Sequence, residues 1–120
     1  MYKYYQEVEK EEHMLFAAEI AELLQLKSLT NKPFRIFVSA FLNDVRERSG
    51  RPRLFYNTKH GLTQVFSKED IFILMEKLYE SLEHSMNNDN QIQIRVKEKL
   101  YTIRCEAKIV KDMEGKLWVG

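Results

Sequence analysis

The densest positive charge in the chain lies between Val45 and Gly61, in the stretch VRERSGRPRLFYNTKHG. Guanidinium and ammonium groups contact phosphates, and aromatic rings stack on bases. Six residues carry this chemistry: Arg46, Arg48, Arg51, Arg53, Tyr56 and Lys59. The same residue types also suit the end of a helix followed by a solvated loop, with Phe55 or Tyr56 turned into the core. We favour this second interpretation.

A second basic surface is expected on the outer face of a carboxy-terminal sheet. If Ile92, Ile94 and Val96 point inward, their sequence neighbours point to solvent. The candidate contact residues on this face are Arg95, Arg104, Lys108 and Trp118. A basic sheet face with a tryptophan has the chemistry of a platform for single-stranded nucleic acid. An ordinary solvated face is the simpler interpretation, and Trp118 is also a candidate anchor for a protein interface.

No catalytic, metal or cofactor motif accompanies these basic residues. Glu9 and His13 are spaced to share a helix face, as are Glu80 and His84. Neither pair has the spacing of zinc or di-iron motifs. Cys105 alternates with apolar residues in a predicted strand, which indicates a buried, unreactive thiol. The glycines form no phosphate-binding loop, so we expect neither an enzyme nor a bound cofactor or metal.

Length and composition predict a single α+β domain over residues 1–120. The net charge of +1 gives no overall attraction to nucleic acid or membranes. The single cysteine and an amino-terminal segment without a signal-peptide core indicate a cytoplasmic protein that makes no membrane contact. The charges nevertheless alternate in blocks, because 1–30 and 67–90 are acidic whereas 31–66 and 91–120 are basic.

Two amino-terminal helices are expected to position the basic stretch. Apolar residues at helical spacing predict a largely buried first helix over 4–29, whose apolar face is also a candidate surface for a homo-oligomer. Pro33 suits the first turn of a second helix, and Gly50 is expected to end it. The segment 33–49 is also rich in β-formers, so a strand there is the alternative.

A hairpin and a third helix are expected next. A turn containing Gly61 separates two short strands, RLFYN and LTQVF. Ser67 is the expected cap of the following helix, with Asp70 in place of the capping-box glutamate. Phe66 and Ile71 are placed as a hydrophobic staple. The predicted buried stripe of this helix consists of Ile71, Leu74, Met75, Leu78, Leu82 and Met86.

Alternating apolar residues over 91–119 predict a three-stranded antiparallel meander, with Gly115 at a turn position that needs positive φ. Helices followed by a terminal hairpin invite comparison with winged-helix proteins, in which the helix before the hairpin reads the major groove. Here that helix carries an acidic excess that includes Glu69, Glu76 and Glu80. Phosphates would repel it, and we therefore do not expect this mode of docking.

These features together favour a small non-catalytic protein that binds another protein as a regulator, adaptor or inhibitor. Small proteins of this kind are common products of phages and plasmids. We expect such an origin because these proteins are common, and no residue of the chain indicates it. The alternative is a nucleic-acid-binding regulator that uses the basic segment 46–59 and the basic outer face of the carboxy-terminal sheet. The two differ in salt dependence, because binding through phosphates weakens steeply with salt.

Overall fold

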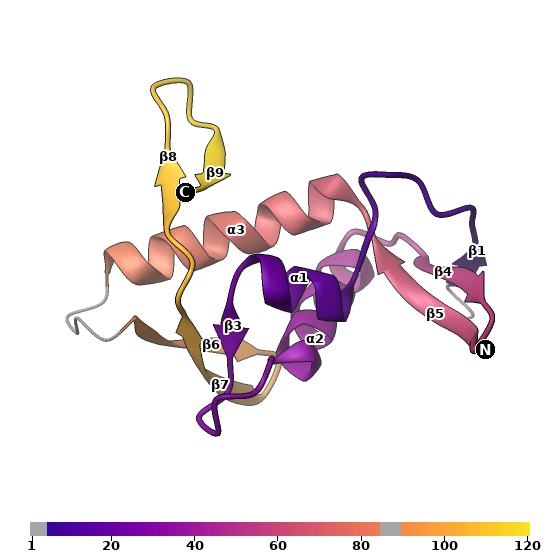
Figure 1. Cartoon of the computed structure of the whole chain (residues 1–120), viewed down its shortest axis with the longest axis horizontal. Coiled ribbons are helices and arrows are strands. Elements are labelled where there is room, and N and C mark those ends of the chain that lie inside the picture. The colour runs from indigo at the N-terminus through magenta and orange to yellow at the C-terminus, as the bar shows by residue number, and fades with distance from the viewer. Residues whose placement is uncertain (1–4, 85–89) are drawn as a thin grey trace.

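The computed structural model describes residues 5–84 and 90–120, which form an α+β arrangement of three helices and nine short strands (Figure 1). The helices are α1 (Ala17–Leu23), α2 (Arg35–Arg48) and α3 (Lys68–Glu83). The strands are β1 (Tyr5–Glu7), β2 (Leu15–Phe16), β3 (Leu26–Lys27), β4 (Arg53–Thr58), β5 (Gly61–Phe66), β6 (Gln91–Val96), β7 (Lys99–Cys105), β8 (Ile109–Lys111) and β9 (Leu117–Val119).

The strands of the described chain form three separate sheets. A four-stranded sheet has the order β1-β4-β5-β2, with β1 parallel to β4 and the other pairs antiparallel. A three-stranded antiparallel sheet has the order β3-β7-β6. The strands β8 and β9 pair with each other, and we call this unit, residues 109–119 with its turn, the ribbon.

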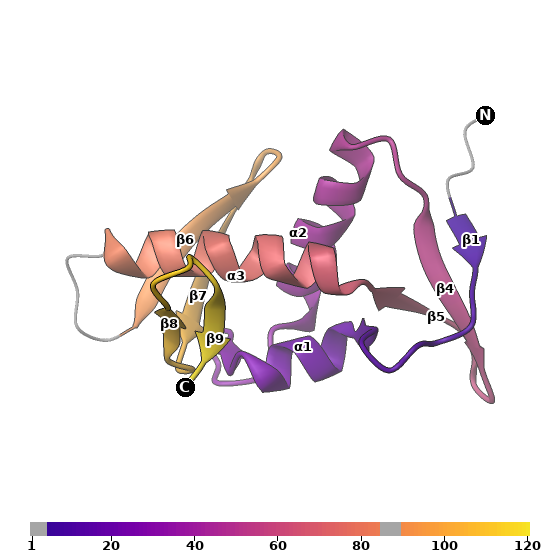
Figure 2. The same ribbon diagram turned by 90° about the horizontal axis from the view of Figure 1, so that it is seen from above.

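Helix α3 lies between the three-stranded sheet and the ribbon (Figures 1 and 2). It contacts β6 on one side and β8 and β9 on the other. The core joins apolar side chains from all of these elements and from the other two helices. Its largest fully buried members include Phe37, Leu42, Leu74, Leu78, Ile94 and Ile103. None of the helices in the described part of the chain is long and apolar enough to cross a membrane.

The expected helix over 4–29 is wrong for most of its length. Only Ala17–Leu23 is helical, and the flanking residues form β1, β2 and β3. The chain leaves the helix at Gln25, which has a φ of +49°, and Leu26 then pairs with Cys105. Pairing with strands that come later in the chain therefore overrides the local helical pattern. Ile20 and Ala21 of α1 are buried in the core of the chain itself, which takes them out of the face considered for a homo-oligomer, whereas Leu23 stays 47% exposed.

The second helix, the hairpin and the third helix are confirmed. Segment 33–49 is helical over Arg35–Arg48, and the following Gly50 has a φ of +66°. Strands β4 and β5 form the expected hairpin before α3. The predicted stripe of α3 is buried at Ile71, Leu74, Met75 and Leu78 and half-buried at Leu82. Met86, the last predicted member, lies outside the described residues.

The carboxy-terminal meander is confirmed for its first two strands and wrong for the third. Strands β6 and β7 pair as a hairpin, but the third strand of their sheet is β3. After Cys105 the chain leaves the sheet: the Glu106 N–H still donates to the Gln25 carbonyl at 3.0 Å, which extends the β3–β7 pairing by one residue, and residues 106–108 then lie outside any strand. The residues that follow then build the ribbon on α3. The inward alternation persists through this break, since Ala107 and Ile109 are buried.

Candidate functional site

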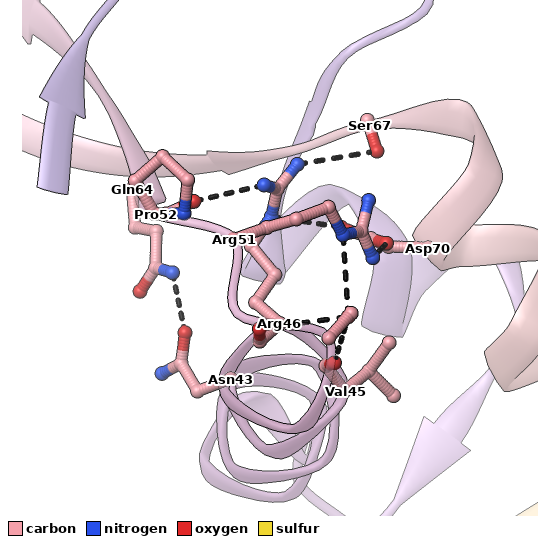
Figure 3. Close-up of polar contacts among 9 residues, drawn as sticks. Asn43, Val45, Arg46, Arg51, Pro52, Gln64, Ser67 and Asp70 are labelled. Carbon is pink, nitrogen blue, oxygen red and sulfur yellow. Dashed lines mark hydrogen bonds and ion pairs between the residues drawn. The ribbon is translucent and has the colours of Figure 1, made fainter. Parts of the chain in front are cut away.

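The basic segment closes a buried ion-pair cluster. Arg46, in the last turn of α2, is only 5% exposed, and Asp70, in the first turn of α3, is fully buried. The Arg46 Nε lies 2.8 Å from one carboxylate oxygen of Asp70, and the Arg51 Nη2 lies 2.6 Å from the other. Figure 3 shows both guanidinium groups converging on this carboxylate. Two of the six predicted contact residues therefore serve the fold.

The surroundings of Arg46 explain how a buried cation is tolerated. Its Nη1 donates to the Pro52 carbonyl at 2.8 Å and its Nη2 to the Ser67 hydroxyl at 3.4 Å. The Arg46 Nε and Asp70 Oδ2 are close enough for an ion pair, but the Nε–H does not point at the oxygen well enough for a hydrogen bond. Burial lowers the pKa of Arg46, and the charge of Asp70 opposes that shift. The cluster thereby joins the end of α2 to the start of α3.

Ser67 occupies the expected N-cap position of α3, but the expected side-chain capping bonds are absent for this reason. Ser67 is the residue before the helix, but its side chain makes no capping hydrogen bond and its hydroxyl accepts from Arg46. Asp70 receives the two arginines in place of a capping bond. A sequence signal for its burial did exist, because Asp70, Leu74 and Leu78 share one helix face at i, i+4 and i+8.

The remaining residues of the basic segment lie apart from one another. Arg48 is 75% exposed and pairs with Asp44 at 3.0 Å on its own helix. Arg53 is exposed at the start of β4, and Lys59 is exposed in the hairpin turn. Tyr56 is half-buried on β4. The four side chains thus offer charge and one ring, but from three different elements.

Arg53 lines a groove of mixed charge between α2 and the β6–β7 turn, with a volume of about 510 Å³. A Lys97–Glu47 ion pair of 2.9 Å bridges this groove. The hydrogen bond from Lys97 lowers the pKa of Glu47. Asp44, Glu98 and Lys99 also line it. Both cationic and anionic side chains line this groove, so its electrostatic potential favours neither a positively nor a negatively charged ligand.

The outer face of the three-stranded sheet is polar and basic, as expected. Arg95 is exposed on β6, and Arg104 is half-buried on β7. The register places Arg104 beside Lys27 of β3, which pairs with Glu106 at 3.8 Å. Lys108 is exposed between β7 and β8. Trp118, which was expected on this face, lies in the ribbon, so the described face has no aromatic ring on which a base could stack.

The ribbon places a group of apolar side chains in solvent. Trp118 is 56% exposed and lies directly opposite Val110, which is 37% exposed. Met113, at the tip of the turn, is fully exposed. Cross-strand aromatic and β-branched residues contact each other on one face of a sheet. The outer face of the ribbon is therefore a small apolar surface centred on Trp118.

Asp112 fixes the position of Trp118. The indole Nε1–H donates to Asp112 Oδ2 at 3.0 Å. The other carboxylate oxygen accepts the backbone N–H groups of Glu114 and Lys116, at 2.9 and 2.8 Å. The bond from Trp118, followed by that from Lys116, lowers the pKa of Asp112. The indole is thus oriented before any partner arrives, which reduces the entropy lost on binding.

The inner face of the ribbon is anchored to the body of the protein. Ile109 and Leu117 are buried in the core cluster. The Lys111 Nζ lies 5.2 Å from the centre of the Tyr79 ring of α3, a cation–π geometry. The exposed apolar side chains therefore stand on a supported element.

The structure also places the cysteine and one glutamate–histidine pair that the sequence singled out as candidate reactive or metal-binding groups. Burial raises the pKa of Cys105 to about 11, which keeps this thiol protonated and unreactive at neutral pH. Glu9 and His13 do not share a helix, and His13 contacts Glu11 at 3.3 Å. Within residues 5–84 and 90–120, no three His, Cys, Asp or Glu side chains are grouped to hold a metal.

Comparison of the chain with protein-family models, with curated proteins and with solved structures gave no match.

Proposed function

We propose that this protein is a small non-catalytic binding module that docks another protein through the outer face of the ribbon and thereby acts as a regulator, adaptor or inhibitor. The observation that carries the proposal is Trp118, which is 56% exposed although its indole N–H is already bonded to Asp112. An aromatic ring held in solvent by its own protein is a typical anchor of a protein interface.

The ribbon has the features of an interface centre. Trp118 and Val110 offer an apolar surface, and Met113 extends it with a flexible side chain that adapts to a partner. Lys116 is exposed on the same element, and Lys108 is exposed immediately before it. An apolar centre with charged residues at its rim is the usual arrangement of a protein interface.

A nucleic-acid-binding regulator is the second candidate. Its support is the register of the three-stranded sheet, which places Arg104 beside Lys27 on the same outer face as Arg95. Against it, Arg46 and Arg51 are paired with Asp70. This leaves a sparse basic surface whose sheet face carries no stacking ring among the described residues, and the protein-binding proposal is the better supported of the two.

The test is affinity capture from the cytosol of the native host, followed by mass spectrometry. Wild-type chain, Trp118→Ala and Leu62→Ala serve as baits, since Leu62 is similarly exposed, at 50%, in the β4–β5 hairpin. We expect a stoichiometric partner with the wild type and with Leu62→Ala. Trp118→Ala is expected to lose it, because truncating a hot-spot residue costs about 2 kcal/mol or more.

The proposal fails if no stoichiometric partner is captured, or if Trp118→Ala captures it as well as Leu62→Ala does. Binding to a mixed-sequence polynucleotide is measured in parallel over a salt series. Tight binding that weakens steeply with salt, and less steeply after replacement of Arg95 and Arg104 by alanine, would favour the second candidate.

A further inference from the structure

We propose that the open edge of β9 binds its partner by strand addition, and that the added segment carries an apolar residue beside Trp118 and an acidic residue beside Lys116. This inference rests on the proposed docking role of the ribbon and specifies the chemistry of the partner. Strand addition draws its affinity from backbone hydrogen bonds and its specificity from alternate side chains.

Two backbone hydrogen bonds define which groups of β9 face its open edge. The Asp112 N–H donates to the Lys116 carbonyl at 2.9 Å, and the Gly120 N–H donates to the Lys108 carbonyl at 2.7 Å. Bonded and non-bonded pairs alternate along an antiparallel ladder. Trp118 lies midway between these two bonded pairs, and its own backbone is therefore bonded to β8.

The intervening residues of β9 are the non-bonded ones. Leu117 and Val119 pair with β8 in register but direct their N–H and C=O groups away from it. Among the described residues, no strand pairs with this side of β9. Figure 1 shows the ribbon projecting from α3, with its second strand away from the other two sheets. An edge of this kind is a template for a further strand.

Side-chain alternation gives the chemistry of the added strand. Lys116 and Trp118 are two residues apart and therefore share the outer face, and both are exposed. A strand laid against β9 presents its own residues, also two apart, to these side chains. Opposite charges and aromatic–apolar contacts are the favourable cross-strand pairs.

The local charge favours an acidic partner. Exposed Lys108 and Lys116 flank Trp118 on the outer face, whereas the carboxylate of Asp112 is occupied by the indole and by two backbone N–H groups. Glu114 in the turn is the remaining carboxylate of the ribbon, so the two exposed lysines leave a local excess of positive charge beside Trp118. The occupant is an extended segment of another protein in which an apolar and an acidic residue lie two positions apart.

The test begins with a random heptapeptide library displayed on phage and selected on the immobilised full-length chain. We expect enriched peptides with an apolar and an acidic residue two positions apart. One selected peptide is then synthesised, and its affinity is measured by fluorescence anisotropy for the wild type, Val119→Pro and Val119→Ala. Proline removes the outward N–H but no bond to β8, whereas alanine removes only side-chain atoms.

We expect Val119→Pro to weaken peptide binding about tenfold relative to Val119→Ala, the effect of losing one hydrogen bond and its geometry. The two variants should melt at similar temperatures, because the free edge carries no ladder bond. A second variant, Lys116→Glu, should select peptides with a basic residue in place of the acidic one.

Three results would overturn strand addition: no enriched peptide, enrichment without this spacing, or equal affinity of Val119→Pro and Val119→Ala. A concentration-dependent dimer that Val119→Pro dissociates would assign the edge to a second copy and overturn the partner named here. If Trp118→Ala abolishes capture of the host partner while Val119→Pro does not, the ribbon remains the docking surface and strand addition fails.

Discussion

Asp70 determines the role of the basic segment. A buried guanidinium without a counter-ion is strongly unfavourable, and Asp70 is the carboxylate that balances Arg46. Its position in the first turn of α3 also suits a negative charge, because the helix dipole is positive there. Arg51 completes the pair from the loop after α2. Two arginines of the basic segment thus link the end of α2 to the start of α3.

Replacing this carboxylate should be costly. We expect Asp70→Asn to lower the free energy of unfolding by about 3–5 kcal/mol, because Arg46 is then buried without a counter-charge. The matched control is Asp44→Asn, which breaks the Arg48–Asp44 pair, whose arginine is 75% exposed, and should cost less than about 0.5 kcal/mol. Urea denaturation followed by circular dichroism measures both. Similar small losses for the two variants would contradict the structural role of the cluster.

The chemistry of single residues was partly predictable from sequence. Cys105 was expected to be buried, and its burial is confirmed. The end of α2 after Arg48 was also expected, from Gly50 and the arginines before it. The pairing of Arg46 with Asp70 was missed, because partners from different helices leave no periodic signal. Only the position of Asp70 on the apolar stripe of its helix pointed to it.

The ribbon is stabilised by the hydrophobic core, against which its inner face packs. A two-stranded hairpin alone is marginally stable in water, but Ile109 and Leu117 are buried against the core. Asp112 then orders the turn and holds the indole of Trp118. The element therefore combines a firm inner face with an exposed outer one.

Acid should loosen the ribbon turn only after the ordinary exposed carboxylates have been protonated. The pKa of Asp112 is lowered by its bond from Trp118, so the stabilisation is fully present above the ordinary aspartate pKa of about 3.9 and is lost as pH falls through the lowered value. The NMR signal of the Trp118 indole N–H reports this step. We expect its midpoint below about 3.9 and expect the step to disappear in Asp112→Asn. A midpoint above that value would contradict the bond.

Elements with long, regular patterns were predictable, and short strands were not. The stripes of α2 and α3 and the β4–β5 hairpin follow directly from residue spacing. The segment 4–29 has the apolar residues of a helix, but most of it adopts other structure because β1 and β3 pair with strands far along the chain. Such pairing depends on the whole fold and not on local propensity.

At the scale of the molecule, the charge blocks become separate surfaces. The exposed face of α3 carries Glu69, Glu76, Glu80 and Glu83, whereas Arg95 and Arg104 lie on the outer face of the three-stranded sheet. The acidic face of α3 opposes docking of that helix on DNA. The apolar ribbon is a third surface, and it is the one we propose to bind a partner.

The candidate site was predictable in residue type but not in place. Trp118 was singled out from its type as an interface anchor or a stacking ring. The expected meander placed it on the basic sheet face, because alternation continues from Cys105 to Ile109 as if the strand were unbroken. The strand instead ends at Cys105, and the chain pairs again only from Ile109, with β9. No local pattern encodes this break.

Trp118 is the only tryptophan in the chain, so the intrinsic fluorescence of the protein reports the central claim directly. The captured partner, or a tryptophan-free fragment of it, is titrated into the wild-type protein while the emission spectrum is recorded. Burial of the exposed indole at the interface predicts a shift of the emission to shorter wavelength that saturates with complex formation. Formation of the complex with an unchanged Trp118 spectrum would contradict the account.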